Sequence, residues 1–73
     1  MKRTIQFAIR RGERYYVAEC LELPIVTQAP TLDELVRNIE ESVALFLKDE
    51  NLSELGLADR PIVLATLELA SAA

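Results

Sequence analysis

Pro30-Thr31-Leu32-Asp33-Glu34 is the stretch of sequence that decides the fold, because an extended segment ends there and a helix begins. Pro30 has no N–H to donate to a sheet ladder, so it marks the end of a strand. Thr31 is a good helix N-cap, since its hydroxyl can accept a hydrogen bond from a free N–H of the first turn. Glu34 can reach back to the N–H of Thr31, which predicts a capping box. The junction therefore separates a β-rich half from a helix.

The segment after the junction has the periodicity of an amphipathic helix over residues 32–48. Asn51 is the expected C-cap. A connector is expected over residues 52–60, with a turn of helix at residues 53–57, and a last strand over residues 62–69. The predicted apolar stripe of the helix consists of Leu32, Leu35, Val36, Ile39, Val43, Phe46 and Leu47.

The segment before the junction predicts three strands. Residues 4–10 alternate between apolar and polar side chains, as a half-buried strand does. A tight turn around Gly12 leads to a second strand over residues 14–21, and a short third strand covers residues 25–28. Ala18 and Cys20 are small enough to let a helix lie across the sheet, so their face is predicted to point inward. The opposite face then carries Tyr15, Val17 and Leu21 outward.

The order β-β-β-α-β predicts a single α+β domain over residues 1–73, with an open, mostly antiparallel sheet and one helix on one face. Ile62 and Leu64 give the last strand a second apolar face. An open sheet with a second apolar face usually dimerises or docks a partner. Arg10 and Arg11 at the first hairpin are a candidate docking patch, or alternatively a solvated turn. The predicted partner-binding residues are Tyr15, Val17, Leu21, Ile62, Leu64, Arg10 and Arg11.

Composition narrows the classes of partner. Eight basic and twelve acidic residues give the 73-residue chain a net charge of −4, which argues against a nucleic-acid surface and favours a basic partner. The alternative is a solvated acidic surface without a partner. Cys20 is alone, so no disulfide forms within the chain, which fits the cytoplasm. No signal peptide and no membrane span are recognisable, so we expect a cytoplasmic protein that does not contact the membrane.

The usual chemistry of an active site is missing from the sequence. The chain has no histidine, and Cys20 has neither a histidine nor a second cysteine to act with, which favours a buried structural thiol. Two glycines do not make a phosphate-binding loop. Tyr15 and Tyr16 could stack on bases, but basic residues that would support nucleic-acid binding are lacking across the sheet. We therefore expect no catalysis, no metal and no cofactor.

With the element order in hand, the chain resembles the HicB-like antitoxin family. The resemblance covers residues 4–50 closely and the last strand loosely. It departs at Ile25 and at Ala29-Pro30, where the family usually has Gly after the Leu-Pro turn and Gly-Asp before the Thr. The motifs that carry it are Tyr15-Tyr16-Val17-Ala18-Glu19-Cys20, Leu23-Pro24, Val26-Thr27-Gln28, Thr31-Leu32-Asp33-Glu34 and Asn38-Ile39-Glu40-Glu41.

The resemblance implies a partial ribonuclease-H-like fold and neutralisation of a small basic HicA-like ribonuclease toxin by direct protein contact. It also implies a homo-dimer or higher oligomer. Many members continue into a DNA-binding domain, and because this sequence stops at Ala73 we expect no C-terminal DNA-binding domain and no direct nucleic-acid binding. The alternatives are a stand-alone oligomeric interaction domain without a toxin partner and, third, a small enzyme.

Overall fold

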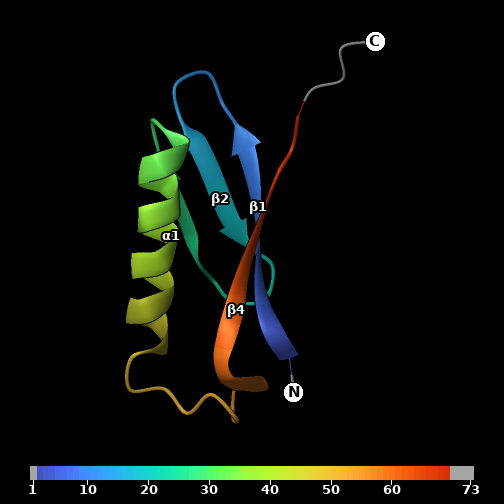
Figure 1. Cartoon of the computed structure of the whole chain (residues 1–73). Helices are drawn as coiled ribbons and strands as arrows, with labels where there is room; N and C mark the ends of the chain where they lie inside the picture. Colours follow the sequence, from blue (N-terminus) through green and yellow to red (C-terminus); the bar gives the residue numbers. More distant parts are fainter. Residues whose placement is uncertain (1, 70–73) are drawn as a thin grey trace.

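The computed structural model describes residues 2–69 as a four-stranded sheet with one helix (Figure 1). The sheet order is β3-β2-β1-β4, with antiparallel pairing of β1 to β2 and of β2 to β3, and parallel pairing of β1 to β4. The predicted α+β class and the β-β-β-α-β order are confirmed. The elements are β1 (Lys2–Arg11), β2 (Tyr16–Cys20), β3 (Val26–Ala29), α1 (Leu32–Leu47) and β4 (Leu57–Leu67).

The junction that opens α1 has the predicted N-cap. Thr31 is extended, with φ −129° and ψ 156°, and its Oγ1 accepts the backbone N–H of Glu34 at 3.2 Å. Within residues 2–69 the Glu34 carboxylate accepts no bond from the Thr31 N–H, so the capping box is half formed. The prediction that Asn51 caps the other end is wrong. The helix ends at Leu47, and Asn51 Oδ1 instead accepts bonds from the backbone N–H and the hydroxyl of Ser53.

The core lies between α1 and one face of the sheet. Ala18 is fully buried and Cys20 nearly so, which confirms the inward face predicted for β2. Val36 was predicted in the apolar stripe of the helix, but it is 47% exposed and lies at the edge of that stripe. The buried core residues are Ile5, Phe7, Ile9, Ala18, Cys20, Ile25, Ala29, Leu35, Ile39, Val43 and Leu57.

Several predicted boundaries differ from the observed ones. The second strand starts at Tyr16 instead of residue 14, because the Gly12 N–H donates to the Tyr15 carbonyl at 2.8 Å and closes the hairpin there. A Cβ at Gly12 would lie 3.1 Å from that carbonyl oxygen, so a glycine suits the turn. β3 runs one residue later than predicted. β4 begins at Leu57, five residues before the predicted start at residue 62, and continues through Arg60 at φ 52°.

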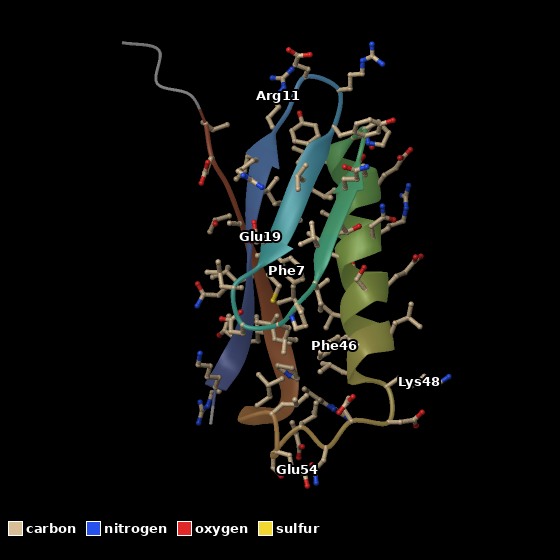
Figure 2. All side chains as sticks on the ribbon, turned by 180° about the vertical axis from the view of Figure 1, so that it is seen from behind. Phe7, Arg11, Glu19, Phe46, Lys48 and Glu54 are labelled. Carbon is tan, nitrogen blue, oxygen red and sulfur yellow. The ribbon has the colours of Figure 1, made fainter. Side chains whose placement is uncertain are left out.

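The early start of β4 gives the core a residue that the sequence did not reveal. Leu57 pairs with Lys2 of β1 and is 2% exposed, and the pairing shifts register before it resumes at Thr4 and Ile62. Figure 2 shows the connector that carries Glu54 at one end of the sheet and Arg11 of the first hairpin at the other.

The helix leaves the outer part of β4 exposed, whereas most inward residues of the other three strands are buried. It packs against β3 and β2, and Asn38 Nδ2 donates to the backbone carbonyl of Gln28 in β3 at 3.1 Å. Val63 and Leu67 lie on the helix side of β4, yet each is 37% exposed. One helix is about 10 Å wide, which is about two strand spacings, so residues 62–67 of β4 stay exposed, although Leu57 at the start of the strand is buried in the core.

Candidate functional site

Most of the predicted partner-binding residues come together on one surface. We call the sheet face opposite α1 the open face. Strand register places Val17 beside Arg10, Ile62 beside Thr4, and Leu64 beside Gln6, all with the alternation that points away from the core. Leu21 joins them, because its N–H donates to the Gln6 carbonyl at 2.9 Å. Leu21 and Ile62 are each 65% exposed and Leu64 is 48% exposed.

The structure separates the two arginines that the sequence grouped. Arg10 lies on the open face, where its guanidinium is 3.6 Å from Glu19 Oε2. Arg11 is the next residue of the same strand, so it points to the helix side, and its guanidinium carbon lies 6.0 Å from the centroid of the Tyr16 ring. The two guanidiniums therefore do not share one face, because successive residues of a strand face opposite sides of the sheet. That either arginine docks a partner stays a prediction.

Tyr15 and Val26 mark the limits of the open face. Tyr15 lies just before β2, at the base of the hairpin, and is 46% exposed. Val26 is opposite Glu19 in β3 and is 66% exposed, so it belongs to the open face although sequence reasoning did not include it. Alternation along residues 26–28 indicates the face of Val26 in the sequence, because Thr27 lies between two outward residues. The register then places Val26 on the same side of the sheet as Val17 and Glu19.

Charge on the open face is nearly balanced. Both side chains of the Arg10–Glu19 pair are more than half exposed, so the pair adds little stability. Glu22 is tied to β1 just beyond the end of β2, since its Oε1 accepts the Gln6 N–H at 2.8 Å. The acidic side chains gather elsewhere: α1 carries Asp33, Glu34, Glu40 and Glu41 against Arg37 alone. The acidic surface and the apolar open face are thus different surfaces, and the sequence alone did not show that they are separate.

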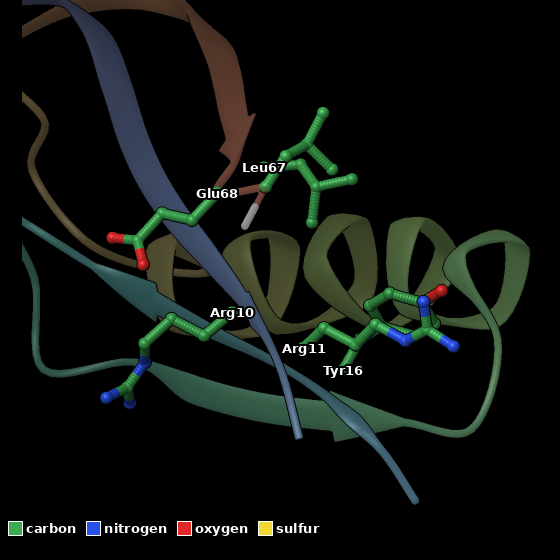
Figure 3. A pocket seen from close by; sticks show the side chains of 6 residues that line it. Arg10, Arg11, Tyr16, Leu67 and Glu68 are labelled. Atoms are coloured by element: carbon green, nitrogen blue, oxygen red, sulfur yellow. The ribbon is translucent and has the colours of Figure 1, made fainter. Parts of the chain in front are cut away.

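A hollow of about 540 Å³ lies at the end of the β1–β4 pair (Figure 3). Figure 3 shows Arg10 and Glu68 on one side of β1 and Arg11, Tyr16 and Leu67 on the other. Because its lining comes from both sides of the sheet, the hollow wraps around a strand end and is not an enclosed cavity. It therefore offers no convergent set of polar groups of the kind that fixes a small ligand.

The chemistry of Cys20 is structural in the described part of the chain. Its buried sulfur accepts the Leu23 N–H at 3.4 Å, and its thiol faces Glu22 Oε1 at 3.7 Å, so it helps to order the turn between β2 and β3. Residues 2–69 contain no group of three or more side chains with metal-binding geometry. In the same range, no helix has the length and apolar character needed to span a membrane.

Comparisons of the chain with protein-family models, with curated proteins and with solved structures found no match. The open face is therefore the best candidate site on physical grounds, and the HicB-like family stays a prediction from the motifs quoted above.

Proposed function

We propose that this protein is a HicB-like antitoxin module that neutralises a small basic HicA-like ribonuclease toxin by binding it directly. The observation that carries the proposal is the open face, on which Leu21, Ile62 and Leu64 expose apolar side chains to water. Several exposed apolar side chains on one sheet face are typical of protein-binding sites. The resemblance in residues 4–50 supplies the class of partner.

The charges suit such a partner in a specific way. The net charge of −4 attracts a basic protein from a distance, while the balanced Arg10–Glu19 pair leaves the contact itself mainly apolar. We therefore expect salt to slow association more than it weakens the complex. Substitution of apolar residues on the open face should do the reverse and speed dissociation.

The experiment uses the product of the neighbouring reading frame, provided that it is a small basic protein, as the probe. Binding to the purified chain is measured by calorimetry, and inhibition of its RNA cleavage is measured in parallel. The variant Leu21→Ser with Ile62→Ser should weaken binding by about tenfold or more, because central apolar side chains dominate interface energy. The matched control is Leu45→Ser, since Leu45 is 73% exposed on α1, away from the open face.

Two results contradict the proposal. One is the absence of any small basic protein, encoded nearby or captured from native extract, that binds the chain. The other is equal loss of binding in the open-face variant and in the Leu45→Ser control, which would place the contact elsewhere.

A second candidate function is a stand-alone oligomeric interaction domain with no toxin partner and no catalysis. The observation that favours it is the uncovered state of β4, where Ile62, Leu64 and Leu67 all remain exposed. Sedimentation analysis separates the candidates, because this function requires stable self-association. A clean monomer at micromolar concentration contradicts it.

A further inference from the structure

The outer edge of β4 has backbone groups that no strand within residues 2–69 uses. The Glu68 N–H donates to the Ile9 carbonyl at 3.0 Å, so the even-numbered residues of the regular part of β4 direct their backbone groups toward β1. Since these groups alternate along a strand, the odd-numbered residues direct theirs outward. Val63, Ala65 and Leu67 therefore present N–H and C=O groups to solvent. Pro61 lies on the same outward side, as is usual for proline in an edge strand.

This edge lacks most of the features that keep sheet edges apart. Residues 61–67 (Pro-Ile-Val-Leu-Ala-Thr-Leu) carry no charge, and no helix covers them. Proteins normally protect an exposed edge by charge, by covering it, by a bulge or by keeping it short. β4 has Pro61 and the irregular residue Arg60 only at its start. The rest of the strand is an apolar template for another strand.

We propose that β4 pairs antiparallel with β4 of a second copy of this chain, about a two-fold axis through Leu64. Outward residues must face outward residues, so the axis passes through a residue. Charge selects the residue on the axis. The uncharged stretch is flanked by Arg60, just before the regular part of β4, and by Glu68, just after its end. An axis at Leu64 brings the Arg60 end of each strand next to the Glu68 end of the other. An axis at Val63 sets Arg60 opposite Thr66 instead, and parallel pairing in register sets like charges together.

The proposed pairing satisfies most of the free backbone groups. Val63 and Ala65 of the two copies form hydrogen-bonded pairs that exchange both N–H···O bonds, while the two Leu64 residues form the non-hydrogen-bonded pair on the axis. Leu67 N–H meets the Pro61 carbonyl of the other copy. An isologous contact of this kind closes as a dimer and stops there. The two sheets become continuous, and their open faces join along the Leu64 side chains.

This inference goes beyond the proposed function, because it uses the β4 edge and requires no toxin. Its experiments use the chain alone, so a failed toxin-binding experiment leaves it standing, and its own failure leaves toxin binding standing.

Disulfide trapping tests the register in a Cys20→Ala background. Leu64→Cys should cross-link to a dimer on mild oxidation, because the Cα atoms of a non-hydrogen-bonded pair lie about 4.5 Å apart, within disulfide range. Ile62→Cys alone and Thr66→Cys alone should not cross-link, but a mixture of the two should, since residue 62 faces residue 66 across the axis. A monomeric native chain at high micromolar concentration overturns the proposal. A dimer that links through Ile62→Cys alone, or fails to link through Leu64→Cys, overturns it as well.

Reversing the charges at Arg60 and Glu68 tests independently whether β4 pairs with β4 of a second copy. Sedimentation should show that Arg60→Glu and Glu68→Arg each weaken dimerisation about three- to tenfold, because two exposed ion pairs become like-charge pairs. The double variant should restore the native affinity. Glu54→Arg, in the connector, makes the same change of charge as Glu68→Arg and should leave the affinity within about twofold. Absence of rescue in the double variant, or a chain that pairs only with a different protein, overturns the proposal.

Discussion

The two edges of the sheet are protected very differently. β3 is short, spanning Val26–Ala29, and α1 packs against it. Its Ala29 is 3% exposed, and Asn38 of the helix caps the outward carbonyl of Gln28. β4 is more than twice as long, and every residue from Ile62 to Leu67 is exposed although all of them pair with β1. The β3 edge is thus protected by α1 and by its own short length, whereas the outer edge of β4 is unprotected over residues 62–67.

The difference arises because the 73-residue chain has one helix to cover a sheet of four strands. The capped junction at Thr31 follows β3 directly, so α1 starts beside that strand and runs over β3 and β2. It cannot also cover β4. We call the part under α1, which holds the buried core, the covered half, and we expect it to supply most of the stability. The uncovered half is the exposed stretch of β4 over residues 62–67, and it supplies the surfaces that we propose for association.

The largest expected effect is the difference in stability lost when a leucine is truncated in the covered half and in the uncovered half. Leu35→Ala should lower the free energy of unfolding by about 3 kcal/mol, because Leu35 is fully buried between α1 and the sheet. Leu64→Ala should cost less than about 1 kcal/mol in the monomer, because half of that side chain already lies in water. Urea unfolding at low protein concentration measures both. Equal costs would contradict the division into a covered and an uncovered half.

The junction that anchors the covered half gives the next effect. Thr31→Ala should cost about 1 kcal/mol, because it removes the acceptor of the Glu34 N–H. Glu34→Ala should cost less than about 0.5 kcal/mol, because only a dipole interaction of its side chain is lost. Thermal unfolding followed by circular dichroism distinguishes them. A Glu34→Ala variant as destabilised as Thr31→Ala would show that the complete capping box forms in solution.

The Asn38 cap gives a smaller effect on stability but a sharper one on association. Asn38→Leu should cost about 0.5–1 kcal/mol, because an exposed hydrogen bond is lost. It also frees the Gln28 carbonyl at the β3 edge, so we expect assemblies larger than a dimer in sedimentation experiments. Gln28→Leu is the matched control, since it changes a side chain at the same edge and leaves the cap in place. Identical sedimentation of the two variants would show that the Asn38 hydrogen bond does not protect the β3 edge from association.

The elements of the covered half could be predicted from the sequence because their signals are local. The N-cap at Thr31 and the small residues Ala18 and Cys20 fixed the start of the helix and the inward face of the sheet. Helical period alone assigned Val36 to the core, yet it is 47% exposed, because it lies on the flank of the helix toward β4, where it lines an open groove with Val63 and Ala65.

The parts that failed depend on contacts distant in sequence. Pro61 and Arg60 read locally as a break before the last strand, whereas pairing of Leu57 with Lys2 extends β4 back beyond them. Arg10 and Arg11 looked like one patch because they are adjacent. Alternation along the strand sends them to opposite faces, and pairing with β2 supplies their different neighbours, Glu19 for Arg10 and Tyr16 for Arg11. Of the candidate site, the apolar residues were predictable from alternation, and their electrostatic balance was not.

The smallest expected effect tests the outer edge of β4 at Pro61. Pro61 lies on the outward side of β4 without an N–H, so in the proposed dimer the Leu67 carbonyl of the other copy lacks a donor. Pro61→Ala supplies that donor. The monomer should lose about 0.4–1 kcal/mol, because the unfolded chain regains freedom. Dimer affinity should rise several-fold, since each added hydrogen bond contributes about 0.5–1.5 kcal/mol. Sedimentation over a concentration series, with urea unfolding in parallel, measures both changes.

Pro24→Ala, in the turn after β2, is the control for loss of a proline and should leave association unchanged. Unchanged or weaker association of Pro61→Ala would show that Pro61 does not limit pairing, and that β4 meets its partner through side chains alone.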